Sequence, residues 1–351
     1  LFLNMDPPLN LEYRALIRDN FTPAAVAGYR DKLERVAKEV VDGVIDRGEC
    51  EFVEEVAAEM PLITILEFFE IPAEERKQFF EWTNLMFFGD DPAYQRQVPE
   101  NANFLVKLIE IVKSKLMKGY KKTRSMKAAV HVILYFRRLA KKWRGREEKN
   151  LCTQLLNGTI NGEPISDDDF AWIALMLVSA GNESTRTAIA HGMRNLMENP
   201  EQYRYLQENP DKIDEAIEEM LRHNTSFITM RKTATHDHCA EELGNAEIKK
   251  GDKVVMYYHA SNYDERFFGD DAAAFDIHRP SRVKGFRQNN RSFGHGKHNC
   301  LGMHLARLEM KTQLSEVLRR MKNPTFAGDV QYIQSNFIQG IHSMPIKFEK
   351  V

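Results

Sequence analysis

A cysteine lies directly before a stretch of helical periodicity in the segment Phe293-Gly294-His295-Gly296-Lys297-His298-Asn299-Cys300-Leu301-Gly302. Free backbone N–H groups at a helix start, and the positive end of its dipole, favour a thiolate over a thiol. Gly296 and Gly302 allow a tight turn and the close approach of a flat ligand. His298 offers a hydrogen-bond donor to an anionic group. These parts suit a Cys300 thiolate that binds a haem iron with a propionate nearby.

A second group of polar residues interrupts the apolar run of a predicted helix, in the sequence Ala180-Gly181-Asn182-Glu183-Ser184-Thr185. Glycine in a helix costs about 1 kcal/mol relative to alanine, and Ser184 and Thr185 can bond back to the preceding turn and loosen it. A buried carboxylate is costly unless it has partners or a function. A widened helix with space at Gly181, a hydroxyl group and Glu183 as proton relay suits oxygen activation. The alternative is a helix kink with satisfied polar groups.

Both patterns resemble those of the cytochrome P450 family. The pattern Phe-x-x-Gly-x-His-x-Cys-x-Gly, from Phe293 to Gly302, is similar to the family's haem-binding loop. The stretch from Ala180 to Ser184 resembles the Ala-Gly-x-acid-Thr pattern of its central helix, with serine in place of threonine. If Cys300 were only a small buried residue, the glycines and the aromatic residue around it would have no role. Serine lacks the methyl group that restricts threonine, so we expect more uncoupling of oxygen consumption.

The resemblance implies haem b as the cofactor, with Cys300 as the iron ligand. Arg14, Arg231 and His298 are then predicted near the haem propionates, because the planar fork of arginine can donate two bonds to a carboxylate. Asn10 and Glu12 stand where histidine and arginine often occur, so we expect one propionate to be held less firmly. The other predicted haem contacts are Ala180, Gly181, Phe293, Gly296 and Gly302.

Glu219 and Arg222 form a Glu-x-x-Arg pattern, whose spacing of three places both side chains on one face of a helix. Such pairs are common and usually exposed, each worth under about 1 kcal/mol. In the resembled family the pair is buried behind the haem and is completed by a later arginine. Arg279, within Phe275-Asp276-Ile277-His278-Arg279-Pro280, is the predicted third member.

An apolar substrate pocket is predicted from residues at positions that resemble pocket-lining ones. These are Val178, Phe227, Ile228, Phe337 and Ile338, and each is equally compatible with ordinary core packing. The resemblance implies a monooxygenase that uses O2 to hydroxylate an apolar small molecule such as a sterol, a terpenoid or a fatty acyl chain.

Electrons are expected from a separate ferredoxin and ferredoxin reductase, because the chain contains no flavin or iron–sulfur sequence. We expect their docking face near the Cys300 loop, with Lys297 and Arg307 as contacts. Two alternatives stay open at this point. One is a peroxide-driven oxygenase of the same fold, against which the Glu183-Ser184 pair argues. The other is a non-catalytic haem-binding protein.

The composition and net charge limit the class of protein and its possible partners. The 351 residues are 43% hydrophobic and 28% charged, as in ordinary globular proteins. The net charge of −2 gives no strong attraction to nucleic acid or to anionic membranes. No apolar run of about 18 residues predicts a transmembrane helix. The four cysteines form no C-x-x-C pair, which predicts a reducing compartment and a cytoplasmic location.

The pattern of elements predicts a mainly α protein with small β sheets, and the resemblance implies the cytochrome P450 fold as one domain over residues 1–351. We expect that domain to lack the family's N-terminal segment and to match poorly over residues 92–150. A long helix is predicted between its cap, Ser166, and Asn199-Pro200. Other helices are predicted at 24–47, 54–69, 73–87, 200–208, 211–223 and 300–321, and strands within 248–258 and 337–348.

Residues 113–149 are rich in lysine and arginine, with only Glu147 and Glu148 of opposite charge. Apolar residues such as Val130 and Leu134 interleave with the cations like the core face of a helix. The sequence therefore favours a solvated helical surface, with contact to a membrane or an acidic partner as the alternative.

Overall fold

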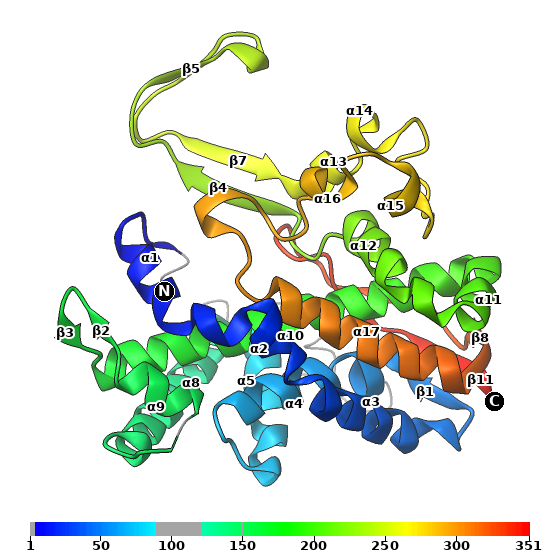
Figure 1. Cartoon of the computed structure of the whole chain (residues 1–351), viewed down its shortest axis with the longest axis horizontal. Coiled ribbons are helices and arrows are strands. Elements are labelled where there is room, and N and C mark those ends of the chain that lie inside the picture. Colours follow the sequence, from blue (N-terminus) through cyan, green and yellow to red (C-terminus); the bar gives the residue numbers. More distant parts are fainter. Residues whose placement is uncertain (1–3, 89–120, 149) are drawn as a thin grey trace, which may run out of the picture.

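Helices form most of the molecule and pack around one long central helix, α10 (Asp167–Glu198) (Figure 1). The computed structural model describes residues 4–88, 121–148 and 150–351. The other helices are α1 (Leu9–Arg18), α2 (Pro23–Ala27), α3 (Arg30–Ile45), α4 (Glu59–Phe68), α5 (Arg76–Phe88), α8 (Lys121–Trp143), α9 (Leu151–Leu156), α11 (Pro200–Glu208), α12 (Ile213–His223), α13 (Tyr258–Asn262), α14 (Glu265–Phe268), α15 (Arg279–Arg282), α16 (Phe286–Asn289) and α17 (Met303–Arg320).

The predicted cap of α10 is present. The Ser166 side chain accepts a hydrogen bond from the Asp169 N–H, and the Asp169 side chain accepts one from the Ser166 N–H. Such a capping box, with acids in the first turn, stabilises the helix start. Beyond this turn α10 is buried almost all round, because α4, α8, α12 and α17 pack against it. The helix ends before Asn199-Pro200, as predicted.

Several helix boundaries differ from the predicted ones. The predicted helix over 24–47 is divided at Gly28-Tyr29 into α2 and α3, and a π-helical turn, Val53–Ala57, precedes α4. The last helix begins at Met303 rather than at Cys300. The Cys300 N–H donates to the Phe293 carbonyl at 2.8 Å, so this amide closes the loop and does not start the helix.

Strands form small antiparallel sheets at the edges of the helical body. β1 (Glu49–Glu51), β11 (Pro345–Lys350) and β8 (Met321–Phe326) form a three-stranded sheet in the order β1-β11-β8. The remaining pairs are β2 (Thr159–Ile160) with β3 (Glu163–Pro164), β4 (Thr229–Thr233) with β7 (Lys253–Tyr257), β5 (His238–Ala240) with β6 (Ala246–Ile248), and β9 (Gln331–Tyr332) with β10 (Ile341–Ser343). The β4–β7 ribbon and the β5–β6 hairpin project from the helical body (Figure 1).

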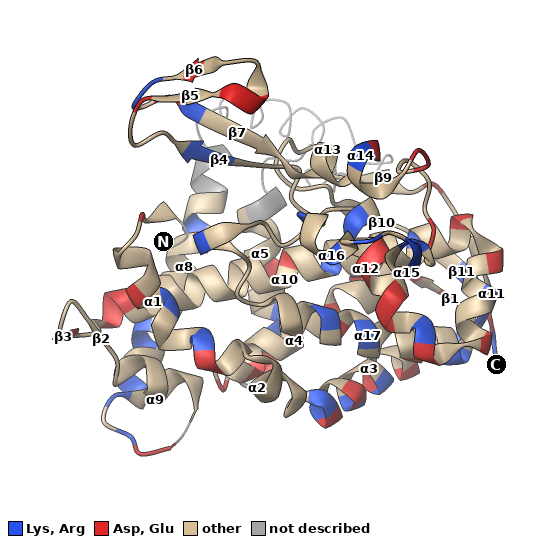
Figure 2. Cartoon of the chain, turned by 45° about the horizontal axis from the view of Figure 1, so that its top comes forward, with Lys and Arg blue, Asp and Glu red and all other residues tan. Residues whose placement is uncertain are grey.

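Charged residues of both signs occur along helices such as α3 and α17 (Figure 2). Part of the basic segment is neutralised within the fold, since Arg137 pairs with Asp168 and Arg144 pairs with Asp167 at the start of α10. These ion pairs agree with the prediction that the basic segment is a solvated helical surface. Residues 113–120 and 149 of that segment lie outside the described residues.

Candidate haem site and active site

The loop before α17 is shaped by glycine conformations and by one backbone hydrogen bond. Gly294 and Gly296 both have φ of +71°, a region that glycine adopts without strain. Gly302 has an ordinary φ of −84°, and a Cβ atom built on it would meet nothing within 4 Å. The loop therefore needs glycine for its turn at Gly294 and Gly296, whereas Gly302 leaves open space beside the cysteine.

The Cys300 thiol lies deep within the protein, yet its side chain is solvent-accessible. Burial raises the pKa of this thiol, while the Gly302 N–H, Arg14 and Arg307 act in the opposite direction. Because α17 starts three residues later than predicted, the helix dipole acts on the sulfur from further away. The positive charges of the two arginines therefore supply part of the stabilisation that we had assigned to the helix start.

Cationic groups gather at one side of the Cys300 loop. The Arg14 guanidinium donates to the Asn299 carbonyl at 2.8 Å. Burial lowers the pKa of His298, and the charges of Lys232 and Arg14 lower it further, so these three side chains lie in one electrostatic environment. Arg231, predicted from the sequence, and its neighbour Lys232 are both exposed on β4, where successive strand residues face opposite ways. The sequence alone does not tell which of these two side chains points to the loop, and in this structure the charge of Lys232 acts on His298.

Two residues of α1 differ in their relation to this cationic group. Asn10 is 0% exposed, and neither its side-chain nitrogen nor its side-chain oxygen has a partner within the described residues. It lies one helical turn before Arg14, on the same face. Glu12 instead accepts a hydrogen bond from the Asn161 N–H at 2.7 Å, in the β2–β3 turn. The Glu12 carboxylate is therefore engaged by the β2–β3 turn, whereas Asn10 is an unpartnered polar side chain inside the protein.

These residues fit a haem. The accessible thiol can bind iron, the open space beside Gly302 admits a flat ring, and the nearby cations suit its carboxylates. The chemistry of this donor set matches the predicted cofactor.

The middle of α10 is accessible although most of the helix is buried. Ala180 is exposed, and Gly181 and Ser184 are half-buried, whereas Val178 and Thr185 are buried. The Ser184 hydroxyl donates to the Ala180 carbonyl at 2.8 Å, which is the predicted back-bond to the preceding turn. The helix nevertheless remains α-helical from Asp167 to Glu198, so the predicted widening is absent from this structure.

Glu183, the residue before Ser184 on α10, is buried. Its Oε1 accepts from Arg186 at 3.3 Å, and Arg186 also donates to the Asn84 side chain of α5 at 3.0 Å. The Oε2 atom has no hydrogen-bond partner within the described residues. Burial raises the pKa of this carboxyl group, although Arg186 opposes the shift. Glu183 is therefore a buried acid with one oxygen available to exchange a proton.

Thr185 contacts a second buried acid that the sequence did not single out. The side chains of Thr185 and of Thr64 on α4 lie beside the carboxyl group of Glu309 on α17, and burial raises the pKa of that group to about 8. The pattern of α17 alone predicts a core face at this position, and only the packing of α17 against α10 identifies the partner. Thr185 is thus occupied by a core contact, while Ser184 faces the accessible side.

The structure brings Glu219, Arg222 and Arg279 together in the protein interior. Arg222 binds both Glu219 oxygens at 2.7 Å, and Arg279 donates to Glu219 Oε1 at 3.2 Å. The other N–H groups of these two arginines donate to backbone carbonyls of residues 262–274 and to the Asp271 side chain. The network joins α12 to the segments that lead into the Cys300 loop, and leaves every charged atom partnered.

Four of the predicted substrate residues form one apolar group. Phe227 pairs with Ile338 in an antiparallel bridge, the Ile228 N–H donates to the Phe337 carbonyl at 2.9 Å, and the Phe227 and Phe337 rings lie 5.0 Å apart. Val178 differs, since it is 0% exposed within the main core. In this structure Val178 packs in the core and does not border accessible space, because α10 turns this face toward its neighbouring helices.

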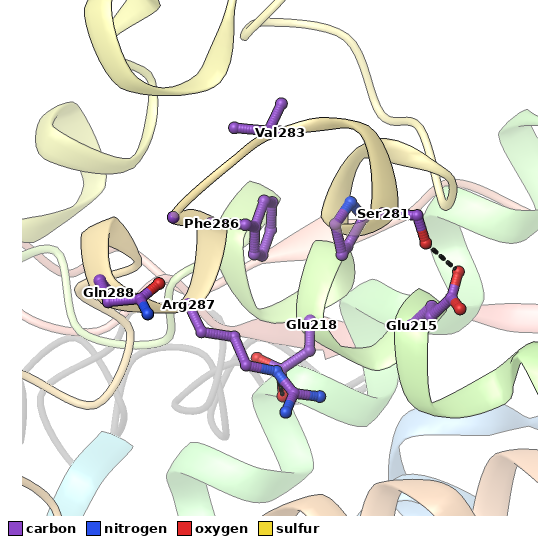
Figure 3. A pocket seen from close by; sticks show the side chains of 9 residues that line it. Glu215, Glu218, Ser281, Val283, Phe286, Arg287 and Gln288 are labelled. Carbon is purple, nitrogen blue, oxygen red and sulfur yellow. Dashed lines mark hydrogen bonds and ion pairs between the residues drawn. The ribbon is translucent and has the colours of Figure 1, made fainter.

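A separate surface pocket of about 370 Å³ lies between α12, α15 and α16 (Figure 3). Its acids are engaged within the protein: Glu215 accepts from Ser281, and Glu218 pairs with Arg287 and Arg307. Arg307 also lies 4.6 Å from the centre of the Phe293 ring. Arg307, which we predicted to contact the redox partners, is therefore held in place by two interactions within the chain. Lys297, the other predicted contact, is exposed.

Comparison with known proteins identifies the family. A sequence model of the cytochrome P450 family matches residues 93–329. The chain belongs to the cytochrome P450 family. It is 31% identical over 350 residues to a steroid C26-monooxygenase of Mycolicibacterium smegmatis, a match that covers 99% of this chain and 73% of that protein.

Other relatives extend the comparison. A linalool 8-monooxygenase of Pseudomonas putida is 26% identical, with 98% of this P450 and 77% of that enzyme covered. The solved structure of a Mycobacterium marinum cytochrome P450 in complex with pseudoionone is 30% identical, with a TM-score of 0.84 over 99% of this chain and 77% of that one. The predicted fold, mainly α with small sheets, is confirmed.

The family membership confirms the enzyme class and the cofactor. This P450 is a haem-thiolate monooxygenase that uses O2 and an apolar substrate. Among residues 4–88, 121–148 and 150–351, no helix has both the length and the apolar character needed to cross a bilayer.

Proposed function

We propose that Cys300 is the iron ligand and that Arg14, His298 and Arg231 or Lys232 bind the haem propionates. The observation that carries this proposal is the position of the Cys300 sulfur, which is deep in the fold, accessible and close to Arg14 and Arg307. When bound, a haem with a thiolate ligand activates dioxygen.

The residues of α10 are proposed to handle protons for that reaction. Glu183 can hold a proton at Oε2, which is buried and has no partner within the described residues. Ser184 can release its bond to the Ala180 carbonyl by rotation about its side chain and donate toward the accessible side. In this proposal the buried acid is the proton reserve and the accessible hydroxyl is the donor that faces the site.

We propose an apolar substrate of the steroid or terpenoid kind, bound against Phe227, Ile228, Phe337 and Ile338. Two relatives are named as steroid and linalool monooxygenases, which supports this chemical class. Electrons are proposed to come from a ferredoxin and its reductase. A cytoplasmic location and a single domain over residues 1–351 stay predictions.

A reconstituted reaction tests this function. The purified holoenzyme is mixed with NADPH, a ferredoxin, its reductase, and cholesterol or linalool under isotopically labelled O2. We expect a hydroxylated product that carries one labelled oxygen atom. Product formation with hydrogen peroxide but none with the reducing system would favour the peroxide-driven alternative. Haem binding without substrate-dependent NADPH consumption would favour the non-catalytic one.

A further inference from the structure

Two short segments of the chain lie side by side next to α10. The first runs from Ser226 to Ile228 after α12, and the second from Phe337 to Gln339 before β10. They are joined by the Phe227–Ile338 bridge and by the Ile228–Phe337 backbone hydrogen bond. Their phenylalanine rings pack together, and Phe337 remains 41% exposed. The two segments therefore form one apolar wall.

This wall is tied to α10 by three consecutive hydrogen bonds. The Ser226 hydroxyl donates to the Ser184 carbonyl at 2.8 Å, and the Gln339 N–H donates to the Ser226 carbonyl at 2.9 Å. The third bond links His191 Nε2 to the Gln339 carbonyl at 2.8 Å. Because Ser184 and His191 both belong to α10, the bonds form a closed ring that begins and ends on the same helix.

His191 is suited to anchor the last of these three hydrogen bonds. Its side chain is 0% exposed, and its ring stacks on Tyr332 of β9 with 6.3 Å between the ring centres. A carbonyl oxygen only accepts hydrogen bonds, so Nε2 carries the proton in this contact. Nδ1 has no partner within the described residues, and burial lowers the pKa of the imidazole to about 4. The imidazole is therefore neutral, and it donates one hydrogen bond from Nε2 to the Gln339 carbonyl.

We propose that His191 is a positioning residue that sets the distance and orientation of the Phe227–Phe337 wall relative to Ser184, and thereby selects which carbon atom of the substrate is oxidised. The proposal rests on the proposed function of this wall as the substrate-binding surface. Position matters because a displacement of about 1 Å at a reacting centre can cost about a hundredfold in rate. An apolar wall has few polar contacts with which to fix a substrate, so its own placement determines the product.

The test compares His191→Met, which removes the donor and keeps most of the volume, with His191→Gln, whose amide nitrogen can replace Nε2. Hydrogen exchange of the peptide over residues 335–341 is measured in each haem-loaded protein. Product distributions are measured with linalool and with cholesterol. We expect exchange of the Gln339 amide to rise at least tenfold in His191→Met, with more than one hydroxylation position. His191→Gln should stay within about threefold of the parent in exchange, with the parent product.

Two outcomes overturn the proposal. One is unchanged exchange and an unchanged product in His191→Met. The other is equal loss of both properties in His191→Gln and His191→Met, which indicates a role of the imidazole in packing alone. If His191→Met does not fold, Ser226→Ala removes the hydrogen bond to the Ser184 carbonyl at the other end of the series. Unchanged exchange of the Gln339 amide in Ser226→Ala also overturns the proposal. A parent that oxidises neither probe contradicts the proposed function, and the exchange experiment still decides whether His191 anchors the wall.

Discussion

The Glu219 network at α12 and the Glu183 pair on α10 both bury an acid against an arginine three residues later on the same helix, but they differ in completeness. Arg222 reaches both oxygens of Glu219, and backbone carbonyls take up the remaining donors. Glu183 has one oxygen without a partner within the described residues, and its contact with Arg186 is longer, at 3.3 Å. A fully satisfied network rigidifies a fold, whereas an unsatisfied buried acid calls for a functional explanation.

The largest effect is expected from Arg222→Ala in the complete network. The substitution leaves Glu219 buried without its main partner, which costs about 3–5 kcal/mol of folding free energy. We expect little or no folded haem protein, measured by haem content and by urea unfolding. Arg319→Ala is the matched control, because Glu316 and Arg319 have the same spacing of three but Arg319 is 64% exposed. Equal losses in the two variants would contradict a special role for the buried network.

Glu183→Gln should have the next largest effect and should act on the reaction without preventing folding. An amide keeps the shape of the side chain but cannot exchange the proton at Oε2. We expect product formation to fall by about a hundredfold while the haem spectrum stays unchanged. Glu198→Gln at the other end of α10 serves as the control and should keep the parent rate. A parent-like rate in Glu183→Gln would assign proton transfer to another group.

Glu309 represents a third way to bury an acid, since it stays protonated at neutral pH. Its pKa rises from 4.5 to about 8 in the folded protein. Between these values the folded state holds a proton that the unfolded state releases, so the free energy of unfolding falls as the pH rises. The slope is at most about 1.4 kcal/mol per pH unit. Urea unfolding at several pH values should give a smaller slope for Glu309→Gln than for the parent, and equal slopes would contradict the protonated state.

The smallest expected effect concerns Ser184. Ser184→Ala removes the accessible hydroxyl, and we expect the amount of product per NADPH to fall a few-fold with the haem spectrum intact. Ser184→Thr restores the methyl group that restricts rotation, and should raise this ratio above the parent value. An unchanged ratio in both variants would exclude a role of Ser184 in proton delivery.

Local patterns in the sequence predicted much of the fold. The Ser166 cap and Asn199-Pro200 define α10 because capping and helix breaking depend on neighbouring residues. The spacing of Glu219 and Arg222 predicted their contact for the same reason. Arg279, 60 residues further along, could be chosen only through the resemblance to the family.

The rest of the site depends on packing between distant segments. The contact of Thr185 with Glu309 follows from how α17 crosses α10, and the choice between Arg231 and Lys232 follows from the face that β4 presents. The bond from His191 to Gln339 joins residues 148 positions apart. Such contacts depend on tertiary structure, which neither periodicity nor residue spacing determines.

The reduced carbon monoxide complex of the purified protein tests the central claim most directly. Thiolate ligation gives a strongly red-shifted Soret band, and we expect this band in the parent and in Cys152→Ala, whose cysteine is buried far from the loop in sequence. The band should be absent from Cys300→Ala. A red-shifted band that persists in Cys300→Ala, or a parent spectrum typical of imidazole ligation, would contradict the assignment of Cys300 as the iron ligand.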